Sequence, residues 1–198
     1  MIHEAAVFLL ADRAAVSVFS RIREPQWDIV LPPTFDMVGA DQPTPLRTSI
    51  NHYAYDNAWV PDMLAGRTMD EAGHDRFDGD LLGANPAGAL QQISAAATRA
   101  AQQVSDPTLA VHCSYGDCPV DDYFWQLNIA RTLSAHDVAA VIGVDDAISE
   151  ELAKQMFDGT APTAFMWRSF GVYREPVPVG PEATWRERYL GLTGRPSV

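Results

Sequence analysis

Four segments of this chain carry apolar residues at the spacing of one helix face, and each is followed by residues that end a helix. A helix of this kind must bury its apolar face against another element, so four of them predict a mainly α-helical, four-helix bundle. Asn85 suits a helix cap and Pro86 the first helical position, while Gly143 is a typical terminator. The predicted helices span about His3 to Ile22, Leu46 to Ala65, Pro86 to Val104 and Val120 to Ile142.

The segments between and after these helices complete a single predicted domain over residues 1–198. A short strand, TLAVHCSY, is expected to turn at GDCP, which places a strand or hairpin between helices three and four. Residues 3–143 form the predicted four-helix core, and 144–198 form a C-terminal cap. The cap is predicted to contain a helix from Ser149 to Phe157 and a last helix in TWRERYLGLTG.

Residues 28–45 form an unusually long connection that is rich in proline and glycine and lacks a helical period. One interpretation is a lid over a cavity, since Phe35, Met37 and Val38 are apolar and exposed apolar side chains on a loop usually cover something. The alternative is a variable surface loop.

Charge and hydropathy exclude two classes of partner. The formal net charge is −12, which disfavours nucleic-acid binding because that binding depends on Lys and Arg beside phosphates. No run is long and apolar enough to span a bilayer, and Glu4, Asp12 and Arg13 interrupt the apolar start, so we expect a cytoplasmic protein. Cys113 and Cys118 are interpreted as small buried thiols, with a redox pair or a nucleophile as the alternative.

Four motifs cover most of the chain in order: NHYAYDNAWVPDMLAG, DRFDGDLLGANP, VHCSYGDCPVDDYFWQ and LGLTGRP. They resemble the actinobacterial DinB-like metal-binding proteins related to mycothiol-dependent maleylpyruvate isomerase. This resemblance implies an up-and-down bundle whose central cavity holds a divalent metal. The implied ligands are a histidine on helix two, and an acidic or histidine residue followed by a histidine on helix four.

The implied metal site is incomplete in this sequence. His52 stands at the first ligand position, but a gapless count from WQ places Ala130 at the acidic position and Ser134 at the second histidine position. His136 lies two residues further on, about 200° around a helix, and is expected to point away.

A catalytic zinc normally takes three protein ligands, so the sequence predicts no bound cofactor. An alternative ligand set joins Asp56 to His112 or a cysteine. If that ligand set formed, the protein would retain a divalent metal such as Zn or Ni and would use mycothiol as cosubstrate.

Other polar side chains are candidates for chemistry in the same cavity. The predicted catalytic residues are His52 as acid or base, Asp56 one helical turn later, and Ser134 as a hydrogen-bonding hydroxyl. The alternative for His52 is a relic histidine that is hydrogen-bonded in the core, and the alternative for Asp56 is a solvated carboxylate. The predicted substrate-binding residues are Tyr55, Trp59, Trp125, Arg131 and His112. The alternative for the three aromatic residues is a place in the core. The alternative for Arg131 is a surface position, and that for His112 is a structural role.

These observations favour a metal-independent enzyme that acts on a small organic molecule. An isomerase or cyclase-type step in specialised metabolism, using acid/base catalysis or substrate positioning, fits a retained cavity with altered ligands. One alternative is a metal- and mycothiol-dependent isomerase or S-transferase. Another is a non-catalytic binding or resistance protein. The sequence is compatible with a monomer or a homodimer.

Overall fold

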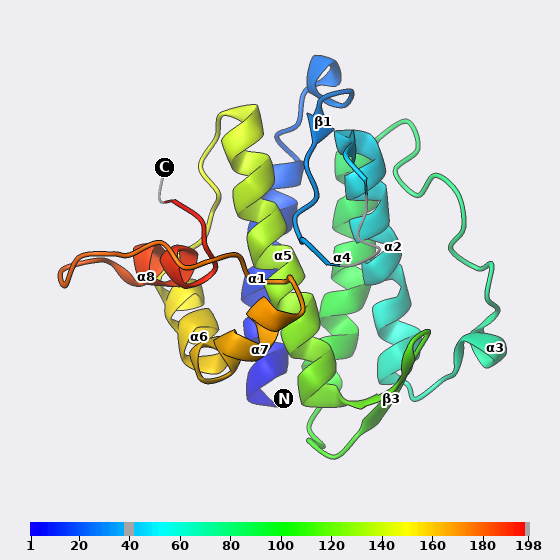
Figure 1. Cartoon of the computed structure of the whole chain (residues 1–198). Coiled ribbons are helices and arrows are strands. Elements are labelled where there is room, and N and C mark those ends of the chain that lie inside the picture. Colours follow the sequence, from blue (N-terminus) through cyan, green and yellow to red (C-terminus); the bar gives the residue numbers. More distant parts are fainter. Residues whose placement is uncertain (38–41, 197–198) are drawn as a thin grey trace.

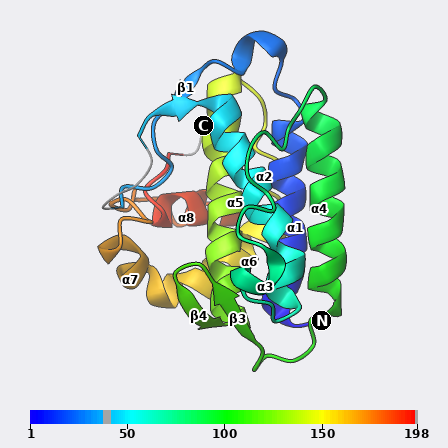
Figure 2. The same cartoon turned by 90° about the vertical axis from the view of Figure 1, so that its right-hand side faces the viewer.

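The structure is a computed structural model that describes residues 1–37 and 42–196. It is mainly helical, with four long helices side by side and two small two-stranded hairpins (Figures 1 and 2). None of the described helices is long and apolar enough to cross a membrane. The long helices are α1 (His3–Phe19), α2 (Leu46–Leu64), α4 (Pro86–Gln103) and α5 (Val120–Ile142). The short elements are α3 (Met69–Ala72), α6 (Glu150–Thr160), α7 (Ala164–Ser169), α8 (Trp185–Leu192), β1 (Val30–Leu31), β2 (Thr44–Pro45), β3 (Ala110–Cys113), β4 (Gly116–Pro119) and 3₁₀ turns at Glu24–Gln26 and Ala161–Thr163.

Local start and stop signals set the ends of the long helices. The Asn85 side chain accepts a hydrogen bond from the Gly88 N–H at 3.1 Å, and Pro86 opens α4, as predicted. Gly143 ends α5 with a φ of 72°, a left-handed conformation that glycine adopts at little cost. The predicted bounds of α5 are confirmed, while α1 ends earlier than predicted, at Phe19.

The direction of the helices differs from the strict up-and-down order expected. The Ile2 N–H donates to the Val104 carbonyl at 2.9 Å, so α1 begins where α4 ends. The Gln26 side chain donates to the Ile142 carbonyl at 3.3 Å, so α1 and α5 end together. The order is therefore up, down, down, up, because residues 65–85 carry the chain back along the bundle before α4 begins (Figure 1).

The predicted hairpin between helices three and four is present, but its turn lies at other residues than expected, and a second hairpin was not predicted. GDCP, expected as a turn, is strand β4, which pairs antiparallel with β3 around a two-residue turn at Ser114 and Tyr115. Within the long connection, β1 pairs with β2 through Val30 with Pro45 and Leu31 with Thr44. This second hairpin was not predicted, because its two segments pair through their backbones and lack the residue pattern typical of strands.

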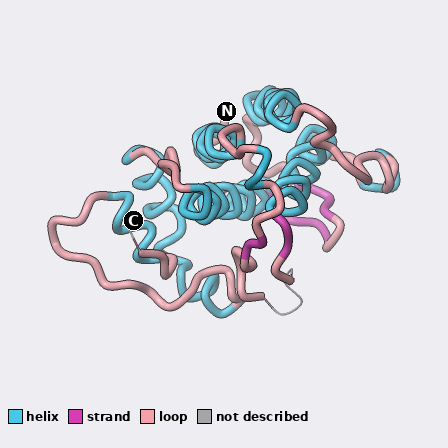
Figure 3. Tube along the Cα trace, turned by 90° about the horizontal axis from the view of Figure 1, so that it is seen from above, coloured by secondary structure: helices cyan, strands magenta, loops and turns pink. Residues whose placement is uncertain are grey.

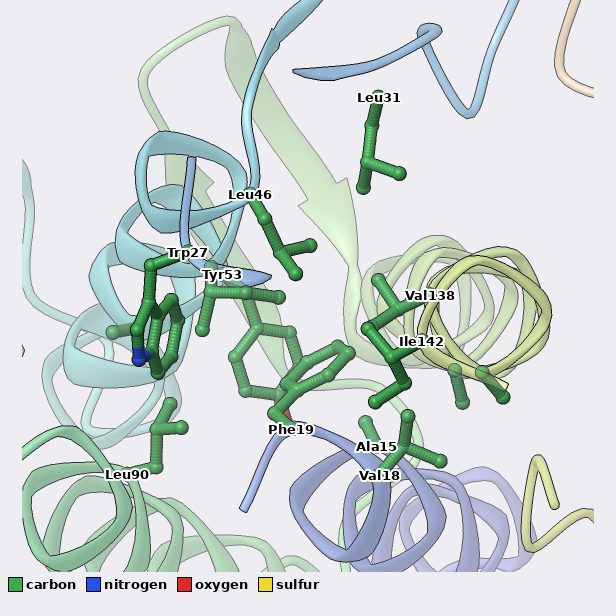
Figure 4. Close-up of a cluster of buried hydrophobic side chains, with 14 of the residues drawn as sticks. Ala15, Val18, Phe19, Trp27, Leu31, Leu46, Tyr53, Leu90, Val138 and Ile142 are labelled. Atoms are coloured by element: carbon green, nitrogen blue, oxygen red, sulfur yellow. The ribbon is translucent and has the colours of Figure 1, made fainter. Parts of the chain in front are cut away.

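The core extends from the bundle into the C-terminal segment. At one end Phe19 packs edge-on against Tyr53, with ring centroids 4.9 Å apart, between side chains of α2 and α5 (Figure 4). Buried side chains of α6 and α8, among them Leu152 and Tyr189, pack with residues of α1 and α5. Seen from above, these C-terminal helices lie on the side of α5 away from α2 (Figure 3).

A buried polar cluster joins the four long helices at mid-height. Asp12 of α1 accepts hydrogen bonds from the Tyr53 hydroxyl and the Asn57 amide of α2, each at 2.6 Å, and from the Ser94 hydroxyl of α4. Arg131 of α5 places its Nε 3.5 Å from Asp12 Oδ1 and donates to the Asn57 side-chain oxygen. Asp12 and Arg131 are each 1% exposed, so each buried charge needs the other as its counter-charge.

Removal of the Asp12 charge is expected to destabilise the fold strongly. Asp12→Asn leaves the Arg131 guanidinium buried without a counter-charge, at an expected cost of about 3–5 kcal/mol in urea unfolding. As a control, Asp158→Asn breaks the exposed Lys154–Asp158 pair and should cost less than about 1 kcal/mol. Equal losses in the two variants would contradict a structural role for the buried charge pair.

Candidate functional site

A cavity of about 270 Å³ lies where α2 and α5 spread apart. The helix pairs α1 with α5, α1 with α4 and α2 with α4 pack closely along their lengths, whereas α2 and α5 do not. The chain segment after β1 closes the gap on the outer side. The polar side chains that line this first cavity are Thr34, Gln42, Thr44, Ser49, His52, Tyr53, Asp56, Arg131 and Ser134.

His52 and Asp56 lie at the mouth of the first cavity, one helical turn apart on α2. His52 Nε2 is 3.8 Å from Asp56 Oδ2, and the two side chains are 64% and 41% exposed. The His52 ring stacks with Tyr55 at a centroid distance of 6.2 Å. The alternative of a relic histidine in the core is therefore wrong, because this imidazole reaches both solvent and cavity.

Ala130 and Ser134 line the same cavity from α5, also one turn apart. They lie on the helix that faces His52 and Asp56 across the gap. The structure thus brings the three predicted catalytic residues to one cavity, since the helical spacing on each side presents one face to the opening. Their roles in a reaction stay predictions.

Arg131 occupies the floor of the cavity rather than the protein surface. Its guanidinium carbon lies 4.8 Å from the Phe8 ring centroid and 5.3 Å from that of Tyr53, in addition to its polar contacts with Asp12 and Asn57. The alternative of a surface arginine is wrong. Because its charge is compensated inside the core, Arg131 shapes the cavity without offering it a free cation.

His136 points away from the cavity, as predicted from its position on the helix. Its Nδ1 lies 2.8 Å from Asp146 Oδ2, and Arg186 donates to the same oxygen at 2.7 Å. Burial raises the pKa of Asp146, but the hydrogen bonds from His136 and Arg186 outweigh it and bring the pKa to about 2. This cluster anchors the C-terminal segment to α5.

In the described part of the chain, the donor side chains do not complete a metal site. Among residues 1–37 and 42–196, no group of three or more His, Cys, Asp or Glu side chains is placed to share a metal ion. His112, in the alternative ligand set, lies on the β3–β4 hairpin with its Nδ1 2.7 Å from Asp117 Oδ1. Of the described residues that line the first cavity, His52 and Asp56 are of ligand type, and a zinc site normally takes at least three protein ligands.

The segment of residues 31–37 forms the outer wall of the first cavity and is tied to the C-terminal segment. The Asp36 N–H donates to the Gly171 carbonyl at 2.8 Å. Arg195, 2% exposed, donates to the Thr34 carbonyl at 2.9 Å and to both Asp137 carboxylate oxygens at 2.7 Å. Phe35 and Met37 line the cavity, whereas Val38 lies outside the described residues. Opening of this wall as a lid stays a prediction.

A second cavity of about 250 Å³ lies beside the first, nearer the β3–β4 hairpin. Tyr55 and Trp59, two of the predicted substrate-binding residues, line it. Trp125 does not belong with them: its ring packs against Gly159 of α6, where an added Cβ would lie 2.0 Å from the ring. Consecutive residues on a helix point about 100° apart, so Gln126 faces the cavity and Trp125 faces α6.

Several lining residues were not predicted from the sequence. Ser49 precedes Tyr53 by one turn, and Tyr123 precedes Ala130 by two turns, so the helical period contains the signal for both. The irregular segment before α2 brings three more lining residues to the first cavity: Thr34, Gln42 and Thr44. The sequence pattern of that segment did not predict their positions.

The two cysteines are free thiols, with Sγ atoms 3.9 Å apart. Burial, with Cys113 close by, raises the pKa of Cys118 to about 11. Cys118 is therefore protonated at neutral pH, which disfavours its use as a nucleophile, because the reactive form is the thiolate.

No family model, curated protein or solved structure matches this chain.

A methyl group at Gly171 is expected to disturb the cavity wall. Gly171 has a φ of +76°, and an added Cβ would lie 2.1 Å from the Asp36 carbonyl oxygen. Gly171→Ala should lose about 1–2 kcal/mol from the backbone conformation and also displace residues 31–37. Faster hydrogen exchange at the Asp36 amide would report that displacement.

Gly143→Ala is the matched control, because Gly143 has a φ of +72° but no described atom within 4 Å of the added Cβ. It should lose similar backbone stability and leave the Asp36 amide unchanged. The same exchange rate in both variants would show that Gly171 does not hold the wall.

Alkylation of Cys118 should be slow at neutral pH because its pKa is raised to about 11. The thiolate fraction, and with it the iodoacetamide rate measured by peptide mass spectrometry, should rise about tenfold per pH unit below that pKa. A plateau near the ordinary thiol pKa of about 8.5 would contradict this assignment.

Proposed function

We propose that this protein is an enzyme that binds a small organic molecule between α2 and α5 and rearranges it by proton transfer, without a metal. The observation that carries the proposal is the meeting of His52, Asp56 and Ser134, from two facing helices, around one cavity. An isomerase or cyclase-type reaction fits best, because it needs positioned acid and base groups and no cosubstrate.

In the proposed mechanism His52 exchanges the proton. An imidazole is the side chain best suited to proton transfer near neutral pH, and this one reaches the cavity and solvent. Asp56, one turn away with its Oδ2 3.8 Å from His52 Nε2, orients the ring. The Ser134 hydroxyl donates a hydrogen bond to a substrate oxygen. The proton that His52 removes from one substrate atom returns at another, so the reaction leaves no net charge.

We also propose that the scaffold is DinB-like. Two of the motifs that suggest this relationship contact each other: Asn51 of NHYAYDNAWVPDMLAG donates to the Gly79 carbonyl at 2.9 Å and accepts a hydrogen bond from the Leu81 N–H at 2.8 Å, both in DRFDGDLLGANP. The pairing supports a common architectural role for these motifs. The metal- and mycothiol-dependent chemistry that the resemblance implies would need at least one more ligand than His52 and Asp56.

Loss of the His52 imidazole is expected to abolish most turnover. The assay incubates the protein with a panel of neutral and amine-containing ketones and polyenes in D₂O and follows deuterium incorporation and product formation by NMR. His52→Ala should lower turnover of any converted compound by about 100-fold or more, and Ser134→Ala by about tenfold. His74→Ala is the matched control, since His74 also lies one turn from an aspartate and is 61% exposed.

Three outcomes would overturn this proposal. Full turnover by His52→Ala would remove the proton-transfer role. Stoichiometric Zn or Ni in protein purified without a histidine tag, with activity lost on chelation, would favour the metal-dependent alternative. A compound that binds tightly and returns unchanged would favour a binding or resistance protein.

A further inference from the structure

The second cavity has mainly aromatic and apolar walls. Tyr55, Trp59 and Met63 of α2 face Tyr123 and Leu127 of α5 across it, and Cys113 of the β3–β4 hairpin closes one side. Tyr55 and Trp59 meet edge-on, with centroids 6.1 Å apart. Concave sites with apolar walls and a few polar groups bind the ring systems of small organic molecules.

The two cavities adjoin along the gap between α2 and α5. Asp56 and Ala130 line both of them, one from each helix. Because the Ala130 side chain is a single methyl group, it leaves the α5 side of this junction open. A molecule that fills both cavities would pass between the Asp56 carboxylate and the Ala130 methyl.

The charges around the two cavities disfavour an anionic ligand. The described acidic and basic residues that line them are His52, Asp56 and Arg131, and Asp12 compensates the Arg131 charge. The chain as a whole carries a formal charge of −12. An anionic group at the junction would be repelled by the Asp56 carboxylate, whereas a hydrogen-bond donor or a cation would be attracted to it.

We propose that the two cavities are halves of one binding site for an elongated molecule without negative charge, with an apolar ring system in the second cavity and a polar, hydrogen-bond-donating part in the first. This inference rests on the proposed function and names its substrate class. It places the bond that reacts near Asp56 and His52, with the ring system held by Tyr55 and Trp59.

Three fluorescent probes with one naphthalene head test the inference: dansylamide has no tail, dansylcadaverine has a cationic tail, and dansyl aminohexanoate has an anionic tail. Energy transfer from tryptophan and the shift of dansyl emission report binding. Dansylcadaverine should bind about tenfold more tightly than dansyl aminohexanoate, a difference of about 1.4 kcal/mol, because the Asp56 carboxylate attracts the cationic tail and repels the anionic one.

The junction is tested with Ala130→Leu, which fills it, and with Ala140→Leu as the matched control on an exposed turn of α5. Ala130→Leu should weaken dansylcadaverine by about tenfold and change dansylamide by no more than about twofold. Ala140→Leu should change neither. Circular dichroism and urea unfolding of both variants establish that the fold is retained.

The outcomes separate this inference from the proposed function. Equal affinity for the two charged tails, or equal effects of Ala130→Leu on tailed and tailless probes, would overturn the single elongated site even if His52-dependent turnover is found. The expected probe pattern together with a complete absence of turnover would support the site and overturn the proposed chemistry.

Discussion

The buried contact between Asp12 and Arg131 is the interaction on which the rest of the structure depends. Each charge alone would be strongly unfavourable in the core, so α1 and α5 must bring both to the same height. Tyr53, Asn57 and Ser94 complete the polar contacts from α2 and α4. A shift of one helix by a turn would leave several of these groups without partners. The cluster therefore sets the helix register, which apolar packing alone specifies less strictly.

The same cluster determines the character of the cavity above it. Since Arg131 is compensated from within the core, its guanidinium closes the floor of the first cavity without acting as an anion receptor. The proposed chemistry of the site rests on His52, Asp56 and Ser134, which reach the cavity from outside the cluster. A rigid polar floor beneath a few accessible groups is an arrangement that holds a small molecule in a defined orientation.

The C-terminal segment has a larger role than that of a cap. Arg195 links Asp137 on α5 to the Thr34 carbonyl, and the Asp36 N–H binds the Gly171 carbonyl, so the last part of the chain holds the outer wall of the cavity. The buried His136–Asp146 contact fixes the start of this segment on the other side of α5. The cavity therefore depends on contacts between residues far apart in the sequence.

The sequence by itself determined the long helices, their caps and the common face of His52 and Asp56, because periodicity, Asn85, Pro86 and Gly143 act over a few residues. Tertiary structure alone decided that α4 runs parallel to α2, that Arg131 is buried, that Trp125 packs on α6, and that residues 31–37 wall the cavity. These features depend on which distant groups compensate a charge or fill a gap. No local sequence pattern predicts these contacts, because they depend on how the whole chain packs.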